Sequence, residues 1–96
     1  MPSPAPDRHE PSRAAQMHRR NARIAGSAAL HRFDKAIALP FLCECSDERC
    51  DELMRISLRE FDEARAGGNY LTVPGHQVDD ATIVRIRESC WLYRPD

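Results

Sequence analysis

The sequence predicts an α+β fold, in which an N-terminal helical segment precedes a small antiparallel sheet with one helix, stapled by zinc. Three observations predict it. The stretch 12–37 is rich in alanine, arginine and leucine; after it, short β-branched and aromatic runs alternate with turn residues; and three of the four cysteines lie within eight residues. We divide the chain into a disordered arm (1–11), the N-terminal helical segment (12–38) and a zinc-binding α+β domain (39–96).

Size and charge narrow the classes of protein to consider. The 96 residues fit one small domain, for which a metal would be a useful staple. The formal net charge of −1 argues against a general binder of polyanions. Residues 1–33 nevertheless carry six arginines against two acidic residues, whereas 34–96 carry eight basic against thirteen acidic residues. The basic part is therefore expected to meet either the acidic part or an acidic partner.

Neither a membrane span nor a secretory signal is expected. The chain has no apolar run of about 18 residues, and its first eleven residues hold four prolines and no apolar signal core. We therefore expect a cytoplasmic protein without a membrane anchor. In that compartment thiols stay reduced, and clustered cysteines more often bind metal than pair as disulfides.

The helical segment begins with Ser12, a typical N-cap residue. Two sets of mostly apolar residues follow, and they fall on different faces of a helix. Gly26-Ser27 lies near the point in the sequence where the first set gives way to the second. The sequence allows either one helix with an oblique stripe or two helices meeting there, because glycine costs about 1 kcal/mol in a helix interior. The first face carries Met17, Asn21, Ile24, Ala25 and Ala28, and the second carries Leu30, Phe33 and Ile37.

Pro40 ends any helix and introduces a predicted β-hairpin. Residues 41–45 and 53–56 read as its strands, with a polar turn at 46–49 and the cysteines at the tip. A second helix is then expected from Ser57, which with Glu60 has the form of a capping box, to about Ala66 before Gly67-Gly68. The later extended runs are 70–73, 82–87 and 90–93, the last two forming a closing hairpin.

Leu58, Phe61 and Arg65 share one face of that second helix. We expect Phe61 and Arg65 to have structural roles. The stem of Arg65 should pack inward and bring its guanidinium to a cluster of carboxylates or carbonyls; the alternative is an arginine that extends along the surface into water.

The thiols at 43, 45 and 50 are spaced to converge on one tetrahedral ion. We predict a zinc site formed by Cys43, Cys45, Cys50 and His76, because His76 follows the rigid Pro74-Gly75 turn. His9, His18 and His31 lie in the basic region and are expected to be solvated. The alternatives are buried thiols without metal, and redox or disulfide use, although a Cys43–Cys45 disulfide would be strained. Cys90, beside Trp91, is expected in the core.

An enzyme is not expected. Three thiolates and one imidazole fill a tetrahedron, which is how structural zinc sites are built. The chain contains no phosphate-binding loop, no nucleophile elbow and no His-Glu-x-x-His motif, and it lacks the His-x-Glu that zinc deaminases carry before their cysteines. The acidic rim of the hairpin reads as a solvated turn; it comprises Asp47, Glu48, Asp51 and Glu52.

From about Arg20 onward, the chain resembles a family of small, functionally uncharacterised bacterial proteins seen chiefly in actinomycetes. The resemblance rests on three stretches: Phe41–Cys45 with Cys50, Ser57–Phe61 with Arg65, and Tyr70–His76. It covers roughly half of the chain and includes all four predicted ligands, but not Cys90. Phe61 stands where a tyrosine is usual, and Gly67-Gly68 where a proline often follows. The resemblance implies that the four ligands act together, and it implies no activity.

These observations favour a small, zinc finger-like protein-interaction module, acting as a regulatory adaptor. We expect its protein partner to contact Met17, Arg20, Arg23, Ile24 and Ala28 on the basic, alanine-rich helix. One alternative is a nucleic-acid-binding protein that uses the helix arginines on phosphates, namely Arg13, Arg19, Arg20, Arg23 and Arg32. Another is a zinc–thiolate redox sensor. The sequence does not specify the oligomeric state.

Overall fold

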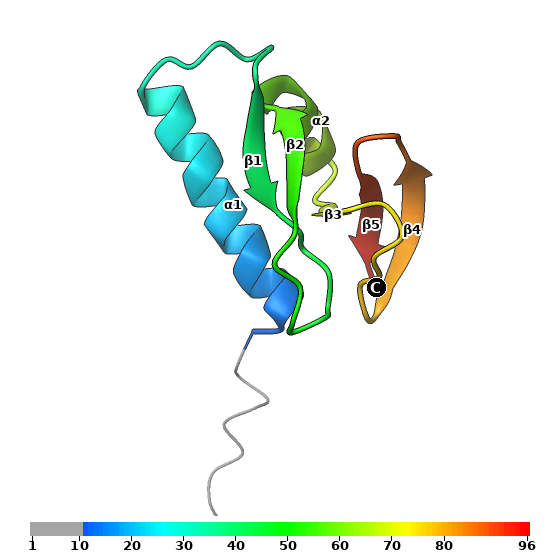
Figure 1. Cartoon of the computed structure of the whole chain (residues 1–96). Helices are drawn as coiled ribbons and strands as arrows, with labels where there is room; N and C mark the ends of the chain where they lie inside the picture. The colour runs from blue at the N-terminus through cyan, green and yellow to red at the C-terminus, as the bar shows by residue number, and fades with distance from the viewer. Residues whose placement is uncertain (1–10) are drawn as a thin grey trace, which may run out of the picture.

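The computed structural model describes residues 11–96 and has the predicted α+β architecture (Figure 1). Helix α1 (Arg13–Leu30) runs alongside the hairpin of β1 (Ala38–Leu42) and β2 (Leu53–Ser57). Helix α2 (Leu58–Ala66) follows β2 directly. The strands β3 (Tyr70–Thr72), β4 (Ala81–Ile86) and β5 (Trp91–Pro95) form a second antiparallel sheet in the order β3-β5-β4. The predicted arm lies almost wholly outside the described residues.

Helix α1 is one continuous helix rather than two. Its N-cap is Ser12, as predicted, and the hydroxyl of this residue accepts a hydrogen bond from the Ala15 amide at 3.1 Å. Gly26 lies on the exposed side, where an added Cβ would meet no atom within 4 Å. The helix therefore passes through Gly26 and tolerates its cost in backbone entropy.

The helix is shorter than the helical segment expected over 12–38, because it ends at Leu30. Arg32 adopts a left-handed conformation with φ 57°. The amides of Arg32 and Phe33 reach back to the carbonyls of Ala29 and Ala28, at 3.1 and 3.0 Å. This is the Schellman arrangement that ends many helices, but an arginine occupies the position where glycine is usual.

The first hairpin has the predicted form, with a shifted first strand. Residues 38–42 of β1 pair with β2 in a register that joins Ala38 to Ser57 and Leu42 to Leu53. Pro40 therefore lies inside β1 rather than before it. Beyond Leu42, the Cys43 amide still donates to the Glu52 carbonyl at 3.2 Å, and the Glu44 amide, which faces the other side, donates to the Leu71 carbonyl of β3 at 2.9 Å. The segment that carries the cysteines thus connects the two sheets.

The core joins α1, both sheets and α2. The Phe41 and Phe61 rings stack with centroids 4.5 Å apart, and both rings are buried, so Phe61 packs in the core. Cys90 is buried in the same core, as predicted. The other buried members of this cluster are Ala28, Met54, Ile56, Leu58, Ala64, Leu71 and Leu92.

Candidate metal centre

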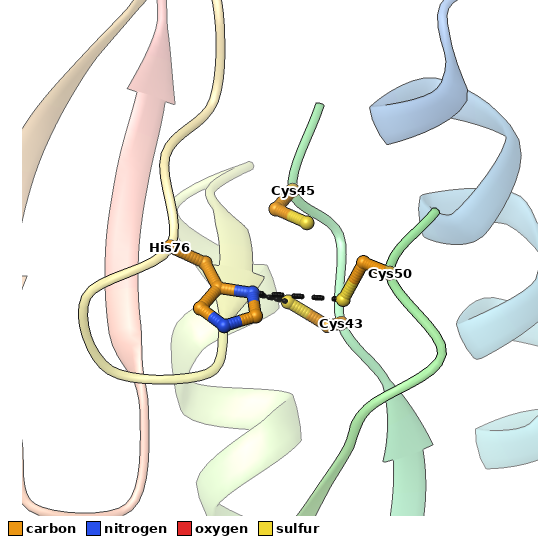
Figure 2. A group of neighbouring side chains, drawn as sticks. All are labelled: Cys43, Cys45, Cys50 and His76. Atoms are coloured by element: carbon orange, nitrogen blue, oxygen red, sulfur yellow. Dashed lines mark hydrogen bonds between the residues drawn. The ribbon is translucent and has the colours of Figure 1, made fainter. Parts of the chain in front are cut away.

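The structure brings together the four residues that the sequence singles out as ligands. Figure 2 shows the side chains of Cys43, Cys45, Cys50 and His76 converging from the hairpin loop and from the loop after β3. Their ligand atoms all lie within 4.8 Å of one another. No other group of three or more metal-binding side chains occurs in residues 11–96. The four side chains therefore form a Cys3His group that could hold one metal ion.

Local turns fix the two loops that carry these ligands. In the hairpin loop, the Cys50 amide donates to the Asp47 carbonyl at 3.0 Å, and the Asp47 side chain accepts from the Arg49 amide at 2.9 Å. In the other loop, the His76 amide donates to the Val73 carbonyl at 3.0 Å, and Gly75 has φ 90°. Proline followed by a left-handed glycine is the sequence of a type II turn, so Pro74-Gly75 positions the imidazole as predicted.

The backbone beside the imidazole is also anchored. The carbonyl of His76 accepts hydrogen bonds from the Tyr93 hydroxyl at 2.7 Å and from the Thr72 hydroxyl at 3.3 Å. The two loops are joined by the Ser46 amide, which donates to the Gln77 carbonyl at 2.9 Å. The site therefore lies between two segments that are already tied to each other and to the second sheet.

The orientation of the His76 ring matches that of a metal ligand. Its Nδ1 lies 3.5 Å from the sulfurs of both Cys43 and Cys50. A Zn–S bond of about 2.3 Å and a Zn–N bond of about 2.0 Å at tetrahedral angles put sulfur and nitrogen about 3.5 Å apart. The other ring nitrogen, Nε2, lies 2.9 Å from the Glu52 carboxylate. A carboxylate in this position fixes the tautomer that leaves Nδ1 free to bind metal.

Backbone and side-chain donors also face the sulfurs. The Val73 amide donates to the Cys43 sulfur at 3.2 Å, and an Nη of Arg13 approaches the Cys45 sulfur at 3.5 Å. Donors of this kind stabilise thiolates rather than thiols. They therefore suit the deprotonated form that binds metal.

Without metal, the thiols differ in acidity. Burial raises the pKa of Cys43 to about 12, and burial also raises the pKa of Cys50. Burial acts in the same direction on Cys45, but hydrogen bonds from the His76 side chain, the Asp47 backbone and the Cys50 side chain outweigh it and lower its pKa. Two of the three thiols are therefore protonated at neutral pH in the metal-free fold.

Arg13 closes the hairpin loop from the start of α1. Its guanidinium donates to the carbonyls of Cys43 at 3.0 Å, Cys45 at 2.6 Å and Cys50 at 2.7 Å. The sequence suggested Arg13 only as a possible phosphate contact, and this assignment is wrong because its donors are engaged by the loop. The available signal in the sequence was the position of Arg13 at the start of an arginine-rich helix. No local motif predicts which backbone carbonyls its guanidinium binds.

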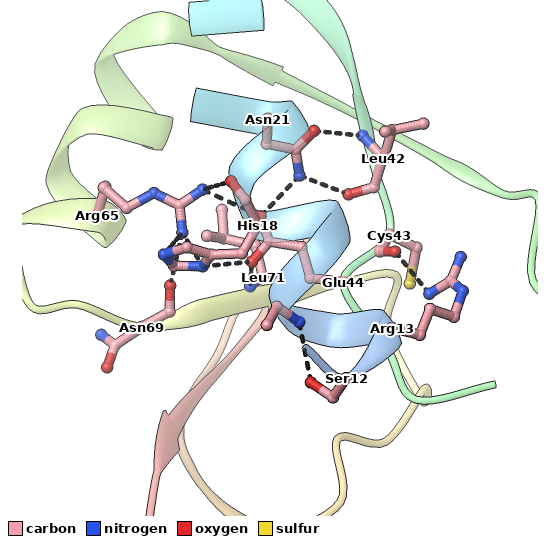
Figure 3. Close-up of polar contacts among 11 residues, drawn as sticks. Ser12, Arg13, His18, Asn21, Leu42, Cys43, Glu44, Arg65, Asn69 and Leu71 are labelled. Carbon is pink, nitrogen blue, oxygen red and sulfur yellow. Dashed lines mark hydrogen bonds and ion pairs between the residues drawn. The ribbon is translucent and has the colours of Figure 1, made fainter. Parts of the chain in front are cut away.

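Glu44, between two of the ligands, faces the opposite way and is fully buried. Alternate side chains of an extended segment point to opposite sides, so Cys43 and Cys45 face the site while Glu44 faces α1. Figure 3 shows the resulting network. The carboxylate accepts from Asn21 at 2.7 Å, from the Leu71 amide at 2.9 Å and from Arg65 at 3.0 Å. Sequence reasoning missed Glu44, although the Cys-Glu-Cys alternation was the signal.

Arg65 has the environment predicted for it. Its guanidinium pairs with the Glu44 carboxylate, donates to the Asn69 carbonyl at 3.2 Å and lies 4.5 Å from the centroid of the Phe61 ring. It also contacts the ring of His18, which lies 3.3 Å from Glu44 and packs edge-on against Tyr70. The expectation that His18 is solvated is therefore wrong, whereas His31 is exposed as expected. His9 lies outside the described residues.

The predicted partner-binding residues divide into two groups. Met17 and Ala28 are buried within the chain, and Ile24 packs partly buried against the core. The prediction that Met17 and Ala28 contact a partner is corrected, because this face of α1 covers the chain's own hairpin. Asn21 on the same face bonds both backbone groups of Leu42, at 2.8 Å each. Arg20 and Arg23 are exposed, and their role stays a prediction.

Comparison with known proteins gives no relative from which to transfer a function: no family model, curated protein or solved structure matches the chain. Within residues 11–96, no helix combines the length and apolar character needed to cross a membrane. The assignment of the site therefore depends on its own geometry.

Proposed function

We propose that this chain is a small zinc-binding protein-interaction module in which the metal has a structural role. The observation that carries the proposal is the distance from His76 Nδ1 to the sulfurs of Cys43 and Cys50, 3.5 Å in both cases. This is the separation that tetrahedral zinc with sulfur and nitrogen ligands requires. Three thiolates and an imidazole prefer zinc to the oxygen-seeking ions magnesium and calcium.

The ligand set also favours a structural over a catalytic ion. Four protein ligands complete the tetrahedron, whereas catalytic zinc keeps one position for water or substrate. The ion would join the hairpin loop to the loop after β3, so that its binding free energy contributes to folding. A regulatory adaptor is the role we assign, because the site would stabilise surfaces rather than carry out a reaction.

The test is metal content together with ligand geometry. Protein prepared under reducing conditions with zinc should contain one equivalent, measured by mass spectrometry of the metal. Cobalt substitution should give the intense visible absorption of a tetrahedral thiolate site. Cys45→Ser should lose both signals, while Cys90→Ser, in which a buried thiol outside the group is changed, should keep them. A replete wild-type sample with well under half an equivalent would contradict the proposal.

A nucleic-acid-binding role is the second candidate, and one observation favours it. Helix α1 carries four arginines and no acidic residue, and Arg19, Arg20 and Arg23 are exposed. Phosphate contacts by these side chains would make binding of a DNA duplex fall steeply with salt. A weak or flat salt dependence would instead favour the protein-interaction role.

A further inference from the structure

An apolar groove lies between α1 and β1, and none of the four candidate metal ligands lines it. It encloses about 520 Å³. Helix α1 contributes Ile24, Ser27 and Ala28, the connection after it contributes Phe33, and β1 contributes Leu39 and Pro40. Phe33 is 51% exposed, although a buried phenylalanine would contribute about 2 kcal/mol of hydrophobic stabilisation. The groove therefore offers apolar surface that the fold leaves uncovered.

The charged residues that α1 places beside this groove are arginines. Arg23 lines its edge, and Arg20 lies one helical turn before Ile24. In residues 11–96, neither arginine forms an ion pair, and α1 contains no acidic residue that could neutralise them. A ligand that fills the groove and carries carboxylates beside it would satisfy both features.

The backbone of β1 excludes one way of binding. Leu42 turns its amide and carbonyl toward α1, where Asn21 binds both. Backbone groups alternate along a strand, so Pro40, two residues earlier, faces the same side. Proline has no amide to donate, and proline on an edge strand blocks the addition of another strand. The ligand must therefore dock through side chains.

We infer that the groove binds an acidic amphipathic helix of a partner protein, with its apolar side chains between α1 and β1 and its carboxylates on Arg20 and Arg23. Helices bind such grooves through apolar residues spaced at i, i+3 or i+4, and i+7. This inference rests on the proposed protein-interaction function and names the class of its partner. It keeps the acidic partner expected from the sequence but moves the contact from the helix face that carries Met17 to the groove between α1 and β1.

The test is an unbiased selection of peptides on the zinc-loaded full chain. Random peptides of about 16 residues, roughly 24 Å long as a helix, would be displayed on phage and selected for binding. The enriched peptides should carry apolar residues at helical spacing and an excess of aspartate and glutamate. In NMR titrations with one such synthetic peptide, the amide shifts should change at Ile24, Ser27, Phe33 and Leu39.

Matched variants locate the contact. Reversing both arginines, as Arg20→Glu with Arg23→Glu, should weaken peptide binding at least about tenfold, and so should Ser27→Glu, which fills the groove from an exposed helical position. Arg59→Glu, which reverses an exposed arginine on α2, should leave the affinity within about twofold. The metal content of each variant, measured in the same samples, should remain that of the wild type.

Three results would overturn the inference. The first is no enrichment by folded, zinc-loaded protein. The second is enrichment of peptides that shift residues of β4 or β5 instead, which would keep the interaction function and move its surface. The third is binding of a DNA duplex that depends on Arg20 and Arg23 but not on Ser27. A wild-type sample that folds and binds the peptide without zinc would contradict the metal proposal alone.

Discussion

The guanidinium of Arg13 donates to the backbone carbonyl of Cys45 at 2.6 Å, which joins the first turn of α1 to the loop that holds the candidate ligands. The same group reaches the carbonyls of Cys43 and Cys50. Zinc with three thiolates and a neutral imidazole carries a net charge of −1, so a fixed cation at this distance also offsets the charge of the site. Helix α1 is thus attached to the candidate metal centre at one end and to β1 through Asn21 near its middle.

Replacing Arg13 should therefore affect both folding and metal binding. Arg13→Met keeps much of the stem but removes three hydrogen bonds from a charged donor, and we expect a loss of about 2–3 kcal/mol in unfolding free energy. The affinity for zinc, measured by competition with a chromophoric chelator, should fall as well. Arg20→Met on the exposed side of the same helix should change stability by less than about 0.5 kcal/mol. Similar losses in unfolding free energy for the two variants would contradict a role of Arg13 in holding the ligand loop.

The buried Glu44 should be the most sensitive carboxylate of the chain. Glu44→Gln leaves the Arg65 guanidinium beside a neutral group and keeps only one acceptor oxygen for three donors, from Arg65, Asn21 and the Leu71 amide. Breaking a buried ion pair typically costs about 3 kcal/mol, which urea denaturation can measure. Glu48→Gln, on the exposed turn of the same loop, is the control and should change stability little. Arg65→Ala should also destabilise the fold, and a loss below about 0.5 kcal/mol would indicate a surface arginine.

The Glu52 carboxylate beside His76 should tune zinc affinity without determining the fold. Loss of a carboxylate that orients a histidine ligand costs about 10-fold to 100-fold in metal affinity. Because the Glu52 side chain is 56% exposed, we expect Glu52→Gln to lie near the lower end, about tenfold. Chelator competition would measure it against Asp51→Asn, a neighbouring carboxylate for which no contact to a ligand occurs in the described residues. Equal affinities for the two variants would show that the pair with His76 is unimportant.

Zinc uptake should release protons, and its affinity should rise with pH. The raised pKa values of Cys43 and Cys50 leave both thiols protonated at pH 7 in the metal-free fold, whereas a thiol must be deprotonated to act as a zinc ligand. Raising the pH therefore removes a competitor, and acidification returns the protons and expels the metal. Calorimetric titrations in buffers of different ionisation enthalpy should give about two to three protons released per zinc. Release of fewer than one would mean that these thiols are not the ligands.

The end of α1 offers a separate test of backbone conformation. Arg32 occupies a left-handed position that costs a residue with a Cβ roughly 1–2 kcal/mol. Arg32→Gly should remove that cost, and the greater freedom of glycine in the unfolded chain should leave a gain of about 0.5 kcal/mol. Arg20→Gly, the same substitution in the helix interior, should instead destabilise by about 1 kcal/mol. Thermal unfolding of the two variants should therefore shift in opposite directions.

Features with a local chemical cause could be predicted from the sequence. Ser12 and Ser57 act as helix N-caps, and Pro74-Gly75 forms the expected turn. The capping box is only half formed, since the Glu60 carboxylate accepts from Ser89 at 3.0 Å and that contact comes from a distant segment. The end of α1 was missed for a different reason, because a helix stop at Arg32 lacks the glycine that usually marks it.

The buried polar network could not be predicted for a similar reason. His18, Asn21, Glu44 and Arg65 meet only after α1, the hairpin loop and α2 have packed together. Each residue alone has an ordinary alternative role on a solvated surface, and no spacing along the chain links residue 21 to residue 44. The candidate metal ligands were easier to identify, because three of the four share one short loop and clustered thiols that stay reduced have few uses besides metal binding.

The alternation at residues 43–45 has a consequence for how this segment can vary. Since neighbouring side chains face opposite sides, one residue added between Cys43 and Glu44 would direct the carboxylate toward the thiols and the Cys45 thiol toward Arg65. Deletion of Glu44 would remove the carboxylate and turn the Cys45 thiol in the same direction. No single change of side chain would disturb both partners at once in this way. The number of residues from Cys43 to Cys45 is therefore more tightly constrained than the amino-acid identity of most residues around them. Insertions should be tolerated only outside this stretch.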